Sequence, residues 1–89
     1  MFSIWKYPLN TSGATELQMP AGAKVLSMQL QGGTPTLWAK VDTTAPLVER
    51  AFHVIGTGWE FDFNPGEFIG TFQMAGGTFV FHVFEVTLS

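Results

Sequence analysis

The chain has 89 residues, of which 46% are hydrophobic, 15% aromatic and only 12% charged; it has a net charge of −3 and no cysteine. Its length predicts one domain over residues 1–89, because chains divide into several domains only when they are about two to three times longer. The absence of cysteine excludes disulfides and thiolate metal sites and fits a reducing cytoplasm, while four scattered Lys and Arg residues are too few for general nucleic-acid binding.

The first residues do not have the pattern of a targeting or membrane segment. Lys6 interrupts the apolar run at residues 1–9, so the run lacks the apolar core of a secretory signal. No run in the chain approaches the roughly 18 apolar residues that a transmembrane helix requires. We therefore expect a soluble, intracellular protein with no membrane partner.

Clusters of Gly, Pro, Asn and Thr separate short segments that are rich in Val, Ile, Phe, Trp and Thr. This alternation is typical of the turns and strands of an all-β domain. It predicts a single small antiparallel β-sandwich or barrel-like meander of about seven strands, with little or no helix. The expected strands are 2–8, 14–19, 24–31, 36–42, 47–55, 67–74 and 78–88.

Two of the turns have a specific signature. Gly32-Gly33 and Gly76-Gly77 each lie between two expected strands, and glycine adopts the positive φ of a tight hairpin without strain. We therefore expect one hairpin between the third and fourth strands and another between the sixth and seventh. A helix over residues 44–52, capped by Thr44, is the alternative to the fifth strand, but the β-branched and aromatic residues there favour the strand.

The last expected strand is apolar on both faces. The two-residue period of a strand places Phe79, Phe81 and Val83 on one side and Val80, His82 and Phe84 on the other. Because the chain has few charges with which to cover its exterior, a second copy is expected to bury the surplus apolar surface. We therefore predict a homo-oligomer.

The segment Gly56–Phe68 is the candidate ligand-binding loop. The backbone N–H groups of Gly56, Thr57 and Gly58 could converge on an anion, and Trp59 could stack on a flat ligand. The segment has neither the Gly-Lys-Ser/Thr ending nor the following helix of a phosphate-binding loop. The alternative is a long connection whose aromatic residues contact the core or a neighbouring subunit.

His53 and His82 are the candidates for acid–base or metal chemistry. Each lies in mid-strand between apolar residues, with Glu49 or Glu85 near it in sequence. Their spacing has no metal signature, and half-buried, hydrogen-bonded histidines explain it more simply. The chain also has no cysteine nucleophile and no serine in a Gly-x-Ser-x-Gly setting. We predict no enzymatic activity, no metal and no cofactor.

The blocks "WKYPL", "LWAKVD", "FHVIGTGWEF", "FIGTFQ" and "GGTFVFHVFE" resemble a family of small proteins of tailed bacteriophages and prophages. The resemblance extends over nearly the whole chain, from Trp5 to Glu85. It implies an accessory protein of phage origin that acts in the cytoplasm of the bacterial host, and it brings no catalytic residues.

Small phage proteins without an active site often act by occupying a host component. The leading hypothesis is therefore a binding protein that neutralises a component of host defence, either a host protein or a nucleotide-like signal held between subunits. Trp59 would stack on the base, the Gly56–Gly58 backbone with Arg50 or Lys40 would contact the phosphate, and His53 or His82 would add a hydrogen bond. The rival hypothesis is a structural or assembly protein that associates with copies of itself, and a flat interface without a pocket would favour it.

Overall fold

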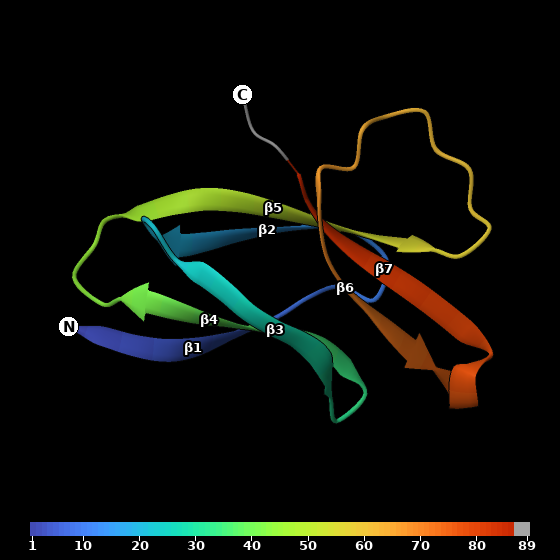
Figure 1. The fold of residues 1–89 in the computed structure, drawn as a ribbon, viewed down its shortest axis with the longest axis horizontal. Helices are drawn as coiled ribbons and strands as arrows, with labels where there is room; N and C mark the ends of the chain where they lie inside the picture. Colours follow the sequence, from blue (N-terminus) through green and yellow to red (C-terminus); the bar gives the residue numbers. More distant parts are fainter. Residues whose placement is uncertain (87–89) are drawn as a thin grey trace.

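The computed structural model describes residues 1–86, which form seven β-strands and one short 3₁₀ turn (Figure 1). The strands are β1 (Phe2–Pro8), β2 (Gly13–Pro20), β3 (Lys24–Gln31), β4 (Thr34–Asp42), β5 (Leu47–Gly56), β6 (Glu67–Met74) and β7 (Phe79–Val86), with the 3₁₀ turn Ala75–Gly77 before β7. All seven expected strands are therefore confirmed. Residues 87 and 88 of the last prediction lie outside the described residues, and residues 44–52 lead into a strand rather than a helix.

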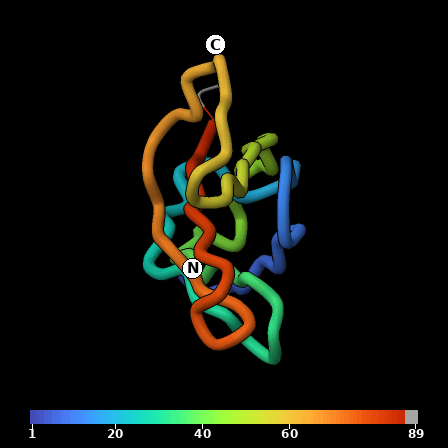
Figure 2. Tube along the Cα trace, turned by 90° about the vertical axis from the view of Figure 1, so that its right-hand side faces the viewer, coloured from blue at the N-terminus to red at the C-terminus, as the bar shows by residue number. Residues whose placement is uncertain are grey.

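The strands form two antiparallel sheets that face each other as an open β-sandwich (Figures 1 and 2). The three-stranded sheet has the order β1-β4-β3, and the four-stranded sheet has the order β2-β5-β7-β6. Neither sheet closes on itself. Of the two folds predicted from the sequence, a sandwich and a barrel-like meander, the structure is therefore the sandwich. Within residues 1–86 there is no α-helix, and no helix there is long and apolar enough to cross a membrane.

The core lies between the inner faces of the two sheets. Strand residues alternate between faces, so in β4 the buried side chains are Leu37, Ala39 and Val41, while Lys40 is exposed on the opposite face. The cluster of buried residues consists of Leu9, Met19, Ala23, Met28, Leu37, Ala39, Val41, Phe52, Val54, Phe72 and Val83. Every strand except β1 contributes at least one residue to this cluster.

Both glycine-containing hairpins are confirmed. Gly32 and Gly33 alone join β3 to β4, and their φ angles of 57° and 81° are those that a tight turn between antiparallel strands requires. The turn Ala75–Gly77 joins β6 to β7. The two hairpins belong to different sheets, so each fixes a register within one layer of the sandwich.

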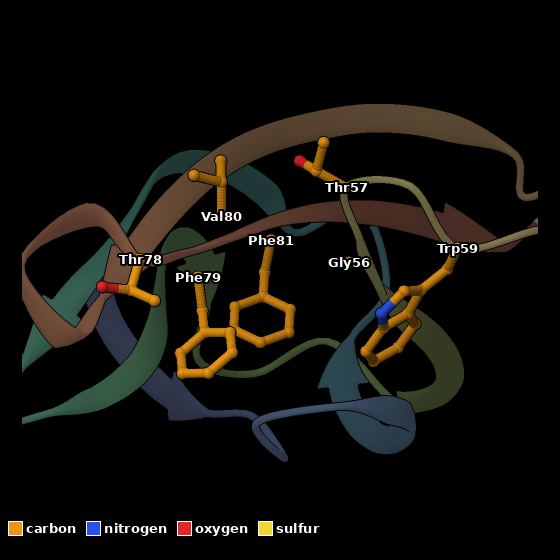
Figure 3. A pocket seen from close by; sticks show the side chains of 7 residues that line it. All are labelled: Gly56, Thr57, Trp59, Thr78, Phe79, Val80 and Phe81. Carbon is orange, nitrogen blue, oxygen red and sulfur yellow. The ribbon is translucent and has the colours of Figure 1, made fainter.

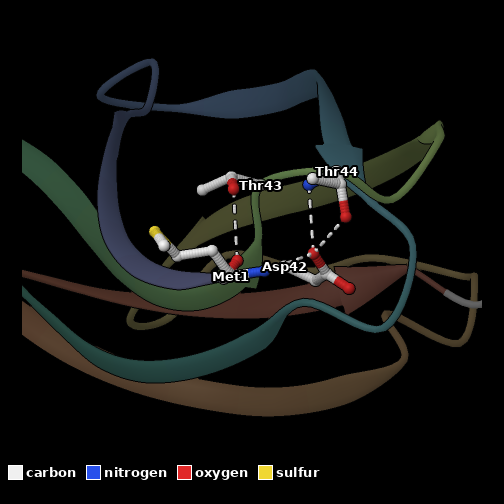
Figure 4. A network of polar contacts seen from close by, with 4 residues as sticks. All are labelled: Met1, Asp42, Thr43 and Thr44. Atoms are coloured by element: carbon white, nitrogen blue, oxygen red, sulfur yellow. Dashed lines mark hydrogen bonds and ion pairs between the residues drawn. The ribbon is translucent and has the colours of Figure 1, made fainter.

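The turn between β4 and β5 carries the chain from one sheet to the other and is held by side-chain hydrogen bonds (Figure 4). Asp42 Oδ1 accepts hydrogen bonds from the Thr44 N–H at 3.0 Å and from the Thr44 hydroxyl at 2.8 Å. The N–H and hydroxyl of Thr43 both donate to the carbonyl oxygen of Met1. The hydrogen bonds from Thr44 lower the pKa of Asp42.

The last strand, β7, lies in the interior of its sheet. It pairs with β5 on one side and with β6 on the other, both antiparallel, so β5 and β6 run parallel to each other. The connection 57–66 must therefore cross β7 to reach β6. In Figure 2 this connection rises at the top of the molecule beside the end of β7. Its first residue contacts the outer face of β7, where the Thr57 hydroxyl lies 2.8 Å from Nε2 of His82.

Candidate functional site

The connection 57–66 begins at a close approach between a tryptophan and a glycine. A Cβ atom added to Gly56 would lie only 2.5 Å from atom Cε2 of the Trp59 ring, so the indole lies against the bare backbone of β5. The backbone N–H of Trp59 donates a hydrogen bond to the backbone carbonyl of Gly56 at 3.1 Å, and this bond closes a turn at the end of β5. The indole meets Phe81 edge-on, with ring centroids 5.9 Å apart.

Trp59, Phe79 and Phe81 form the wall of a pocket at one open end of the sandwich. The rings of Phe79 and Phe81 are stacked with centroids 6.4 Å apart. Figure 3 shows the three aromatic side chains on one side of β7, while Thr57 and Val80 point to the other. The pocket has a volume of about 470 Å³ and is lined by Gly56, Thr57, Trp59, Thr78, Phe79, Val80 and Phe81. A second hollow of about 430 Å³, bordered by Thr11, Ser12, Met74 and Ala75, shares the same three aromatic residues.

The aromatic residues of this pocket remain accessible. Trp59 is 52% exposed and Phe79 is 57% exposed. Apolar rings that face a hollow lose contact with water when a flat group fills it, and this gives the site its capacity to bind. We refer to Trp59, Phe79 and Phe81 as the aromatic pocket.

The charges beside the aromatic pocket are negative. Glu60 and Asp62 lie one and three residues after Trp59 and, together with Phe61 and Trp59 itself, line a further open hollow. No Lys or Arg is among the described residues that line the pocket. This environment favours a neutral or cationic ligand and repels a phosphate.

Arg50, expected to contact a phosphate, has another role. Its guanidinium donates two hydrogen bonds to the carboxylate of Glu85, at 2.6 and 2.7 Å, and one to the carbonyl oxygen of Ala23. Hydrogen bonding to Glu85 raises the pKa of Arg50. Arg50 also lies six residues before Gly56 on the same strand, which separates them by roughly 20 Å at about 3.3 Å per residue.

Lys40, the other expected phosphate ligand, lies in the three-stranded sheet. Its Nζ atom is 5.5 Å from the centroid of the Phe2 ring. Its strand, β4, has no residue in the lining of the aromatic pocket. The structure therefore does not bring Arg50 and Lys40 together with Trp59.

His82 lies on the face of β7 that points away from the aromatic pocket. Its Nε2 atom is 2.8 Å from the Thr57 hydroxyl, and its Nδ1 atom is 3.0 Å from the Thr71 hydroxyl. The imidazole thus ties the start of the connection 57–66 to β6. Both ring nitrogens thus face hydroxyl groups rather than the carboxylate that lies near each histidine in the sequence.

His53 contacts an aromatic ring rather than a charged group. Its ring centroid lies 5.1 Å from that of Phe63. Within residues 1–86, no three His, Cys, Asp or Glu side chains gather closely enough to hold a metal ion. Neither histidine lines the aromatic pocket.

The comparisons with known proteins give a family. A family model described as a domain of unknown function, DUF7352, matches residues 1–89. The chain belongs to this family. No curated protein and no solved structure matches it.

The DUF7352 chain also has an aromatic feature that sequence reasoning missed. Phe61 contacts Phe63, Phe63 contacts His53, His53 is paired in register with Phe84, and Phe84 contacts Phe68. These five residues, the aromatic row, extend from the connection 57–66 across β5 and β7 to β6 on the outer face of the four-stranded sheet. Phe68 is 56% exposed. Only the strand register shows the row, because its members are far apart in sequence.

Proposed function

We propose that this protein is a non-enzymatic binding protein that holds a flat, neutral or cationic group against Trp59 in the aromatic pocket. The observation that carries the proposal is the hollow of about 470 Å³ between Trp59, Phe79 and Phe81, with two of these rings more than half exposed. Stacking of one base on an aromatic side chain contributes about 1–3 kcal/mol. The pocket is large enough for a single ring system or for an aromatic side chain of a protein partner.

The acidic neighbourhood determines how a nucleotide-like ligand would lie. Glu60 and Asp62 flank Trp59, and Arg50 is occupied by Glu85. A nucleotide would therefore bind by its base and leave its phosphates in solvent, away from the two carboxylates. This differs from the phosphate cradle expected from the sequence, while the stacking role of Trp59 is kept.

The resemblance to proteins of tailed bacteriophages supplies the biological setting of this proposal. In that setting the bound group belongs to a component of host defence in the bacterial cytoplasm, and the protein acts by occupying it. Either a base-containing signal or an aromatic side chain of a host protein fits the chemistry of the pocket. Occupation of such a site requires no catalytic residue.

The substitution Gly56→Ala tests the pocket without removing an aromatic ring or a charge. Its added methyl group would lie 2.5 Å from the Trp59 ring and would displace the indole. Gly70→Ala is the matched control, because a Cβ there would lie 3.5 Å from Met28, an ordinary contact. We expect adenosine to shift the NMR signal of the Trp59 indole N–H in the parent and the control. In Gly56→Ala the affinity should fall about 10- to 100-fold, the loss of one stacking contact.

Charge is tested by comparing probes on the same protein. Adenosine and phenyltrimethylammonium should bind more tightly than adenosine 5′-monophosphate, because Glu60 and Asp62 repel the phosphate of the nucleotide. Absence of any shift at millimolar concentrations of all three probes would refute the proposal. Equal binding by Gly56→Ala and the parent would refute the role of Trp59.

A second function, self-association in a structural or assembly role, is favoured by the aromatic row. Soluble monomers rarely expose contiguous apolar patches of this kind, and such patches usually mark an interface. The aromatic row lies on the outer face of the sheet and is separate from the aromatic pocket. Self-association and ligand binding can therefore be measured independently.

A further inference from the structure

The outer face of the three-stranded sheet collects the lysines of the chain. Lys40 is paired with Ile4 on one side and with Lys24 on the other, and Lys6 is paired with Trp38. Directly paired residues of antiparallel strands point to the same face. Since Leu37, Ala39 and Val41 take the inner face of β4, the three lysines all point outward. All three are exposed.

The outer face of the four-stranded sheet is acidic. Glu16 is paired with the outward-facing Ala51, and Glu49 is paired with Gln18 on the same face. Both glutamates are exposed, as are Glu60 and Asp62 on the connection that crosses this sheet. Arg50 is the only Lys or Arg in these strands. It lies on the same face of β5 as the buried Phe52, which is the inner face, and it is hydrogen-bonded to Glu85. Within residues 1–86 this outer face therefore presents no Lys or Arg of its own.

Each outer face also carries exposed apolar groups beside its charges. Phe2 is 70% exposed and Ile4 is 60% exposed on the lysine face, next to Lys40. The acidic face carries the aromatic row, including Phe63 and Phe68. An apolar centre with charges of opposite sign around it is the composition of a complementary interface.

We propose that copies of this chain associate head to tail, with the lysine face of one copy on the acidic face of the next. The two faces lie on opposite sides of the sandwich, so one copy cannot satisfy both within itself. Pairing of two identical faces by a two-fold axis would place like charges opposite each other, which is costly. A heterologous interface of this kind propagates into a ring or a filament.

The two outer faces point in opposite directions. The Cα trace extends 41 × 31 × 15 Å, and in the view down its shortest axis β5 and β2 lie above β4 and β1 (Figure 1). Each partner contributes roughly 800 Å² to a typical stable interface, so such an interface includes the connections beside each sheet as well as its strands. The inference rests on the self-association named above as the second function and adds its geometry; it does not depend on the aromatic pocket.

A charge-swap experiment tests the geometry. Lys24→Glu with Lys40→Glu makes these four strand positions all acidic, and Glu16→Lys with Glu49→Lys makes them all basic. In sedimentation velocity at tens of micromolar, we expect the parent to assemble and each double variant to associate about tenfold or more weakly. An equimolar mixture of the two should assemble again, because each face then meets its opposite.

The variant with all four substitutions is the matched control. It has the parent's net charge and exchanges the signs of the four strand positions, so the attraction between these positions is kept and the variant should assemble by itself. Recovery on mixing also shows that the double variants are folded, and thermal melts of each verify this directly.

The outcomes separate the two proposals. A parent that stays monomeric at hundreds of micromolar overturns both self-association and its geometry. If the parent and both double variants assemble equally well, the head-to-tail geometry is wrong and self-association remains. Edge-to-edge pairing through β1 would give this result. Folded double variants that fail to assemble when mixed also overturn the geometry.

Discussion

Replacing Gly66 with alanine tests how the connection 57–66 is anchored on β7. A Cβ atom at this position would overlap the carbonyl oxygen of Glu85 and lie 3.0 Å from the Cα of Val86. Both neighbours are backbone of a strand paired on both sides, so they cannot rotate away as a side chain would. Gly66 also has a φ of +98°, which costs a residue with a Cβ about 1 kcal/mol.

The expected loss is the sum of these two effects. Overpacking against a fixed structure costs about 1–3 kcal/mol, so with the backbone term the total is about 2–4 kcal/mol. For a domain of this size each kcal/mol lowers Tm by about 4–8 °C, which gives roughly 8–32 °C for Gly66→Ala. Differential scanning calorimetry of the purified protein measures this shift.

Gly22→Ala is the control that isolates the close approach. Gly22 has a φ of +79°, but a Cβ there would meet nothing within 4 Å. We expect only the backbone cost of about 1 kcal/mol, or roughly 4–8 °C in Tm. Equal losses of Tm in the two variants would show that the connection does not lie against β7 as described.

Two further predictions concern polar contacts. Arg50→Met removes both hydrogen bonds from Glu85, whose side chain is only 19% exposed, and should lower the free energy of unfolding in urea by about 2–3 kcal/mol. Lys40→Met, at an exposed cation, should change it by less than about 0.5 kcal/mol, and equal effects would contradict the structural role of Arg50. The lowered pKa of Asp42 means that its contribution to stability is present above its unfolded pKa of about 3.9 and is lost as pH falls through the lower folded value. Thr44→Val removes the hydroxyl and keeps the backbone N–H, so it should raise that pKa part of the way toward its ordinary value in an NMR titration and weaken the acid-side loss of stability; an unchanged pKa would refute the contribution of the Thr44 hydroxyl.

The strands could be predicted because their signals are local. Gly32-Gly33 defines a hairpin by itself, and the alternation of β4 between buried and exposed residues follows from the two-residue period. Pairing could not be predicted in the same way. β1 pairs with β4 and β2 with β5, and these contacts join segments that are about thirty residues apart, so many registers satisfy the same pattern.

The same distinction explains the candidate site. Trp59 and Gly56 are three residues apart in sequence, and the structure places the indole on Gly56. Arg50 reads as a free cation in the sequence because its partner, Glu85, lies 35 residues away. Phe81 reads as a core residue by its parity, and it does pack against the core, stacked on Phe72 with ring centroids 5.2 Å apart. That it also lines a pocket could not be predicted, because the pocket depends on the position of Trp59.

The position of β7 has a consequence for synthesis on the ribosome. This strand is the last of the seven to be translated, yet it fills the place between β5 and β6. Until its eight residues leave the exit tunnel, β5 keeps one edge of backbone N–H and C=O groups without a partner, and β6 has no strand to pair with. β5 and β6 therefore leave the ribosome before the strand that joins them, and until β7 inserts their open edges can pair with another chain.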